Sequence, residues 1–221
     1  MESPSAATAR TPLTREAVLR AAVSIADAQG LDALSMRALG AALGVQAMSL
    51  YKHVANKDAI LDAIVDVVVG EIELPSRADP WKLAMRRRAL SAHAVLLRHP
   101  WACGLMMSRM NVGPAMLRYV DATLGCLQAG GFSLPLADHA WNAMDSFIYG
   151  FTLHKLNFPI QEGAYAAMAA AYLPSLPVAQ FPAMHALTVM VAGGEHDGLH
   201  DLAFGLDLLL NGLQALLRAE G

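Results

Sequence analysis

Apolar residues recur three or four positions apart along most of the chain. In the first such segment, Val18, Leu19, Ala22, Ile25 and Ala26 follow this spacing, which places side chains on one face of an α-helix. The sequence holds no sustained alternation of apolar and polar residues, which would mark a half-buried strand. The pattern therefore predicts an all-α protein.

Polar capping residues and glycines divide the N-terminal part into four short helices. Thr14, Ser35 and Asn56 are residue types that accept hydrogen bonds from the first amides of a helix. Gly30 and Gly44 suit the backbone turn that ends one. The expected helices span residues 14–30, 35–44, about 46–51 and about 56–72.

Prolines and glycines mark the ends of the later helices. The stretch 159–182, which contains Pro159, Gly163, Pro174 and Pro177, is expected to be a long, partly ordered loop with an Ala-rich turn or two. The remaining segments have helical spacing and short connections. The expected helices span residues 81–99, 101–110, 114–129, 136–157, 183–193 and 199–218.

Three regions follow from these elements. Residues 1–12 are rich in Ser, Ala, Thr and Pro and are expected to be flexible. Residues 13–58 are expected to form a compact N-terminal domain, because very short turns join their helices. Residues 59–221 are expected to form a larger helical domain.

Composition and charge narrow the class of protein only slightly. Hydrophobic residues make up 55% of the chain and charged residues 16%, which suits buried subunit contacts or an apolar cavity. The net charge is −3. Residues 1–58 hold six Lys and Arg against five Asp and Glu, and the remainder holds ten against fourteen. This asymmetry is weak support for an N-terminal contact with nucleic acid.

The sequence contains few of the motifs that would indicate an enzyme, a secreted protein or a membrane protein. Cys103 and Cys126 are too few for a disulfide framework and are expected to be buried free thiols. A nucleophile elbow, a phosphate loop and a dinucleotide fingerprint are all missing. Because the sequence has neither a signal-peptide pattern nor an uninterrupted apolar run of about 18 residues, we expect a cytoplasmic protein without a membrane span.

The most informative segment is residues 34–62, LSMRALGAALGVQAMSLYKHVANKDAILD. Gly44 permits a tight turn between two helices, and Val45 places an apolar side chain in that turn. Ala38, Leu39 and Leu50 would hold the two helices together. This arrangement predicts a helix-turn-helix that presents polar residues to the major groove of DNA. The outward residues are Arg37, Gln46, Ala47, Ser49, Tyr51, Lys52 and His53.

The runs LSMRALGAALGV and SLYKHVANKDAIL resemble the TetR family of bacterial repressors. The runs GFSL at 131–134 and FGLDLLLNGLQALL at 204–217 resemble the C-terminal domain of its tetracycline-repressor branch. The resemblance implies an N-terminal three-helix DNA-binding domain and a larger ligand-binding and dimerisation domain. It also implies a homodimeric repressor that binds a palindromic double-stranded DNA operator and is released by a small-molecule effector.

The resemblance assigns DNA-binding roles to individual residues. Arg37 is expected to reach a guanine edge, and Gln46 to read a base. Ala47 stands where the tetracycline repressors carry a longer polar residue; it can touch only a thymine methyl, so the operator sequence stays open. The residues expected to contact or approach phosphates are Thr14, Ser49, Tyr51, Lys52, His53 and Lys57.

Methionines and aromatic residues gather on the middle helices. Core packing explains most of them, but the resemblance implies that some line an adaptable effector pocket. The candidate pocket residues are Arg88, Trp101, Met106, Met110, Asn111, Trp141, Met144, Asp145, Phe147, Phe151 and His154.

The effector is expected to be largely apolar and to need no metal or other cofactor. In an ungapped alignment of each helix, Met106, His154 and Arg88 replace the histidine, carboxylate and amide with which the tetracycline repressors hold a chelated Mg²⁺. A thioether is a poor ligand for Mg²⁺, which prefers hard oxygen donors. His196 and His200 have a spacing that could hold a metal on a helix, but a solvated loop before the last helix is favoured.

Leucines form a seam on the last helix, and helix 136–157 also carries a broad apolar face. The resemblance places both helices in a four-helix bundle between two subunits. The expected dimer-interface residues are Leu202, Leu206, Leu209, Leu213 and Leu216.

Two alternative functions stay open. One is a DNA-binding regulator that responds to a protein partner, and the other, less favoured, is a small helical enzyme.

Overall fold

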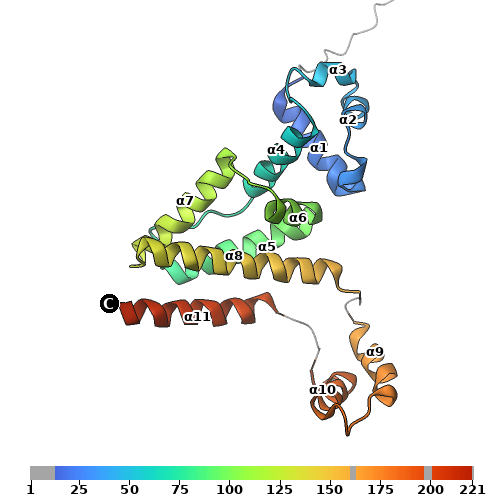
Figure 1. Cartoon of the computed structure of the whole chain (residues 1–221), viewed down its shortest axis with the longest axis vertical. Coiled ribbons are helices and arrows are strands. Elements are labelled where there is room, and N and C mark those ends of the chain that lie inside the picture. Colours follow the sequence, from blue (N-terminus) through green and yellow to red (C-terminus); the bar gives the residue numbers. More distant parts are fainter. Residues whose placement is uncertain (1–12, 160–162, 197–200, 221) are drawn as a thin grey trace, which may run out of the picture. The chain divides into compact units, whose positions relative to one another are not determined.

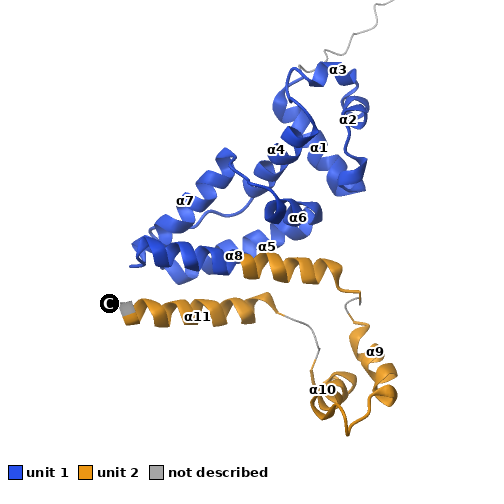
Figure 2. Cartoon of the chain, viewed as in Figure 1, with its two compact units in different colours: residues 1–145 blue, residues 146–221 orange. Residues whose placement is uncertain are grey.

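The computed structural model describes residues 13–159, 163–196 and 201–220, and within them every regular element is a helix (Figure 1). This confirms the all-α prediction. The segment 1–12, predicted to be flexible, lies outside the described residues. Internal contacts divide the chain into two units, residues 1–145 and 146–221 (Figure 2). The domain boundary predicted after residue 58 remains a prediction.

The first unit begins with four helices that have the predicted caps. Side chains of Thr14, Ser35 and Asn56 accept from Ala17, Ala38 and Ala59 amides at 3.1, 3.1 and 2.8 Å. Gly30 and Gly44 end the first two helices with φ of 80° and 64°, values that disfavour residues with a Cβ. The helices are α1 (Arg15–Gln29), α2 (Met36–Leu43), α3 (Ala47–Leu50) and α4 (Lys57–Val69), with a 3₁₀ turn at Leu31–Ala33.

One apolar cluster holds these four helices together, and we refer to α1–α4 as the head. Burial of each large side chain contributes on the order of 1.5–3 kcal/mol. Residues of α4 belong to the cluster as much as those of α1, so α4 is part of the head core. The buried members are Val18, Leu19, Ala22, Ile25, Leu34, Leu39, Leu50, Val54, Ile60, Ala63 and Ile64.

The rest of the first unit is a set of longer helices. Pro100 and Pro114 each occupy the first turn of a helix, where the missing amide costs nothing. Trp81 packs edge-on against Phe132 with ring centroids 4.8 Å apart. The helices are α5 (Trp81–Arg98), α6 (Pro100–Ser108), α7 (Pro114–Ala129) and the first part of α8 (Leu134–Asn157).

Both cysteines are buried free thiols, as predicted. Burial raises the pKa of the Cys103 thiol to about 11, and desolvation also raises that of Cys126. Thiolate chemistry is therefore suppressed at both sites.

The second unit holds the end of α8, two short helices that pack on each other, and a long last helix. In the described part of the predicted loop over 159–182, the expected Ala-rich turns form a regular helix, YAAMAAAY, so this part is more ordered than predicted. Alanine has the highest helix propensity, and Pro174 and Pro182 lie in first turns rather than helix interiors. The elements are α9 (Tyr165–Tyr172), a 3₁₀ turn at Leu173–Ser175, α10 (Pro182–Ala192) and α11 (Leu202–Glu220).

Candidate DNA-binding and effector sites

The pair α2–α3 has the geometry of a helix-turn-helix. Leu39 and Leu50 are fully buried and anchor the two helices. Gly44 turns the chain in the left-handed conformation. A Cβ on Gly40 would lie 2.8 Å from the carbonyl oxygen of Val45, so the glycine allows α2 to approach the turn closely. The one-turn helix α3 is thereby fixed with one side on the core and the other toward solvent.

The structure places most predicted DNA-binding residues on this outer side or at its edge. Ala47, Ser49 and His53 are half-buried, and the Thr14 hydroxyl is engaged in the cap of α1. Met48 was missed by sequence reasoning, although it is the most exposed residue of α3 among the large apolar ones, at 74%. The predicted residues that are exposed are Arg37, Gln46, Tyr51, Lys52 and Lys57.

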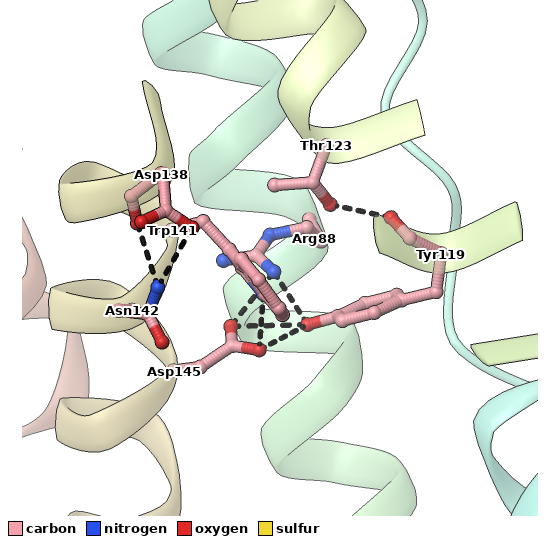
Figure 3. Close-up of polar contacts among 7 residues, drawn as sticks. All are labelled: Arg88, Tyr119, Thr123, Asp138, Trp141, Asn142 and Asp145. Carbon is pink, nitrogen blue, oxygen red and sulfur yellow. Dashed lines mark hydrogen bonds and ion pairs between the residues drawn. The ribbon is translucent and has the colours of Figure 1, made fainter. Parts of the chain in front are cut away.

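A buried polar network joins α5, α7 and α8 in the first unit (Figure 3). Arg88 is wholly buried, and its Nη1 donates to Asp145 Oδ1 at 2.8 Å and to the Tyr119 hydroxyl. The same carboxylate accepts from Trp141 Nε1 at 2.8 Å and from the Tyr119 hydroxyl at 3.1 Å. The guanidinium also lies over the Tyr119 ring, 5.1 Å from its centroid.

This network is costly to bury and therefore depends on its internal pairing. Removing a charge from water costs several kcal/mol in a protein interior, and only a partner with good geometry offsets that cost. The network unites three predicted effector residues, Arg88, Trp141 and Asp145. Tyr119 is a fourth member that sequence reasoning missed, because a tyrosine inside a helix carries no local signal for a partner 26 residues away.

Other predicted effector residues of the first unit lie elsewhere. Trp101 packs on the head cluster and donates from Nε1 to Asp27 on α1 at 2.6 Å. Met110 is 89% exposed. With Asn111 it lines a groove of about 630 Å³ beside α1 and α4, and none of the four network residues lines that groove. Met106 and Met144 are buried in the core.

In the second unit, the rings of the predicted residues Phe147 and Phe151 pack in a tilted arrangement with centroids 5.8 Å apart. The ring centroids of His154 and Phe158 are 5.3 Å apart. A second, strongly apolar pocket of about 250 Å³ lies between α9 and α10. Its lining includes Tyr165 but none of the predicted effector residues.

Carboxylates spaced four residues apart on α4 hold the segment that joins α6 to α7. Arg109 donates from Nε to Asp62 at 2.6 Å and from Nη1 to Asp58 at 3.4 Å. The hydrogen bond to Asp62 raises the pKa of Arg109 above its ordinary value. Asp66 accepts from the amides of Ala115 and Met116, both at 2.9 Å, and so caps α7, where a negative charge is favoured.

We call these contacts, Asp58 and Asp62 with Arg109 and Asp66 with the start of α7, the α4 clamp. The same helix contributes Ile60 and Ile64 to the head core. The helix α4 therefore lies between the other helices of the head and the rest of the first unit, and it is fixed to both.

The last helix, α11, carries two kinds of apolar position. Phe204 and Leu208 are 68% and 60% exposed. Among the described helices, α11 is also the one whose length and apolar composition would suffice to cross a membrane. Of the predicted interface residues, Leu209 is half-buried and Leu216 is 53% exposed. The other three, which are already buried within the single chain, are Leu202, Leu206 and Leu213.

Comparison with known proteins gives two adjoining family matches. Residues 18–64 match the family described as bacterial regulatory proteins, tetR family. Residues 74–217 match the tetracyclin repressor-like C-terminal domain. Together the two matches span the head and nearly all of the remaining helices.

Individual relatives agree with these matches. The HTH-type transcriptional repressor DrrR1 of Streptomyces coeruleorubidus is 31% identical over 93% of this chain and 78% of its own length. Tetracycline repressor protein class D of Escherichia coli is 29% identical over 94% of this chain and 92% of its own.

Solved structures of ActR from Streptomyces coelicolor have a similar fold. Apo ActR superposes with a TM-score of 0.81 at 29% identity, covering 96% of this chain and 100% of ActR. ActR in complex with actinorhodin gives 0.76 at 30% identity, covering 95% and 99%.

The α4 clamp predicts a specific pattern of stability. Asp66→Ala removes the cap of α7 and should lower the free energy of unfolding by about 1–2 kcal/mol. Asp58→Ala is the matched control, because its side chain is 77% exposed and such pairs contribute roughly 0–1 kcal/mol. Urea unfolding of the two variants measures the difference, and equal losses would contradict the assignment.

Gly113→Ala gives a second arm of the same test. Its Cβ would lie 2.2 Å from Asp66 Oδ1, so it should destabilise the wild type by disturbing the cap. In the Asp66→Ala background the two closest contacts are gone and only the Cβ of residue 66, at 2.8 Å, remains, so Gly113→Ala should cost less. Additive losses in the double variant would show that the two residues do not interact.

Proposed function

The chain belongs to the tetR family of bacterial regulatory proteins, DNA-binding transcriptional repressors rather than enzymes, and from this premise we propose that it acts as a homodimer on a palindromic operator. A small, largely apolar effector releases it. The observation that carries the proposal is the exposed outer side of α2–α3, supported from behind by fully buried leucines. A regulator of this kind acts in the cytoplasm, where the DNA is.

The DNA contacts divide into base reading and phosphate binding. Arg37 and Gln46 are exposed at the start of the two helices of the motif and suit guanine and adenine edges. Tyr51, Lys52 and Lys57 are exposed at the end of α3 and the start of α4. Their hydroxyl and ammonium groups suit phosphates, which position the protein without reading sequence.

Dimerisation follows from the surface of α11. Phe204, Leu208 and Leu216 leave large apolar areas exposed on one long helix, and such areas mark an interaction surface. A second copy that covers this helix would give one molecule with two heads, and a two-fold dimer reads a palindrome.

Operator recognition predicts different effects for two basic residues. Arg37→Ala should weaken binding by about 1–3 kcal/mol and relax one base position, because it removes a base contact. Lys57→Ala should weaken all sequences alike and reduce the salt dependence, because it removes a phosphate contact. Selection from a random duplex library, followed by gel shifts at two salt concentrations, measures both effects.

The same selection tests the proposal as a whole. The wild type should enrich a palindrome and bind it as two copies per duplex. Enrichment of no sequence would contradict operator binding, and a complex with a single copy would contradict the homodimer.

The effector proposal rests on the Arg88 network. Arg88, Tyr119 and Trp141 are donors that converge on one buried carboxylate, and an effector oxygen would take its place on them. ActR is seen in complex with actinorhodin, which supports a small-molecule effector for this chain as well. Small-molecule sites are lined mostly by apolar side chains with a few polar groups, which favours a largely apolar compound with few oxygen groups.

A tetracycline–magnesium chelate should not be the effector. Met106 supplies a thioether where a metal ligand would be needed. Titration of the operator complex with tetracycline and Mg²⁺, followed by gel shift, should leave the DNA bound. Release at micromolar tetracycline would contradict the assignment.

A further inference from the structure

Met48 is an apolar residue on the outer side of α3. Its side chain is 74% exposed, in the middle of a one-turn helix whose Leu50 is wholly buried. An exposed methionine forfeits the burial that favours apolar side chains. Its position on the DNA-reading helix indicates what else it can contact.

Helical geometry places Met48 at the centre of the outer side. The amide of Ser49 donates to the Gln46 carbonyl at 2.9 Å, and the amide of His53 donates to the Leu50 carbonyl at 2.8 Å. The helical turn of the backbone therefore continues past both ends of α3. Residues three and four positions after Met48 are Tyr51, 48% exposed, and Lys52, also exposed. These three share one side of the helix, opposite Leu50.

The chemistry of this side chain limits what it can read on DNA. A thioether is at most a weak hydrogen-bond acceptor, so Met48 cannot distinguish bases by their donors and acceptors. The methyl group of thymine is the apolar group that base pairs present in the major groove. Met48 has three rotatable bonds and adapts its shape to an apolar partner. Ala47 beside it is short and half-buried.

We infer that Met48 is a specificity-determining residue that reads the C5-methyl group of a pyrimidine in each half-site; this rests on the proposed operator binding. The protein then prefers thymine to cytosine at that step and accepts 5-methylcytosine in its place. Operator affinity therefore responds to cytosine methylation there. Burial of one methyl group corresponds to a factor of roughly four in affinity per half-site, and roughly fifteen for a palindrome.

The test replaces methyl groups on the DNA one step at a time. In the selected operator, each symmetric pair of thymines is exchanged for deoxyuridine, which lacks only the methyl group. For the wild type, exchange of one such pair should weaken binding by roughly fifteenfold. For Met48→Ala, exchange of the same pair should leave binding unchanged. In a duplex with cytosine at the same step, 5-methylcytosine should restore affinity to the wild type but not to Met48→Ala.

A matched control separates this contact from a general loss of an exposed methionine. Met107 is 57% exposed on α6, and Met107→Ala should keep the wild-type deoxyuridine pattern. A step that is sensitive in both the wild type and Met48→Ala belongs to another residue, such as Ala47. If every sensitive step is of that kind, or if the wild type is insensitive throughout, the inference is overturned while operator binding stands. Failure to bind any duplex would overturn both.

Discussion

The architecture of the first unit depends on α4 being fixed on two sides at once. Its apolar side chains Ile60 and Ile64 complete the head core, and its carboxylates hold Arg109 and the first amides of α7. The attachment to the head is apolar, and the attachment to Arg109 and α7 includes a few directional polar contacts. Such contacts are lost over small displacements, so a shift of the α6–α7 segment must move α4 or break the clamp.

The Arg88 network supplies a second directional constraint in the same unit. It ties α7, through Tyr119, to α5 and α8 (Figure 3). The helix α7 is thus held by a buried ion-pair network near its middle and by the Asp66 carboxylate at its start. An effector that exchanges partners in the network would alter the position of α7, and the clamp would pass that change to α4 and the head. Such a ligand needs only a difference of a few kcal/mol between two arrangements of the helices.

Much of the fold could be predicted because its signals are local. The caps at Thr14, Ser35 and Asn56 and the glycine turn at Gly44 act within one helical turn, and the structure confirms each of them. The order of α9 was underestimated, as an Ala-rich turn or two in a loop, because flanking prolines were weighed above the alanine-rich run. Arg109 was missed because its partner on α4 lies 47 positions away. Met48 was missed for a different reason. Sequence reasoning assigned DNA contacts mainly to polar residues of the recognition helix, and a large apolar side chain there was not considered as a base contact.

In the proposed homodimer, the α4 clamp would hold each head in the position that a palindromic operator requires. The most direct test compares Arg109→Ala with the wild type on a full operator and on a single half-site. Loosening the clamp should leave half-site affinity nearly unchanged, since Arg109 is not on the DNA-reading side. The advantage of the full operator should fall by roughly tenfold, because two loosely held heads lose effective concentration for each other. An unchanged ratio of the two affinities would contradict the account.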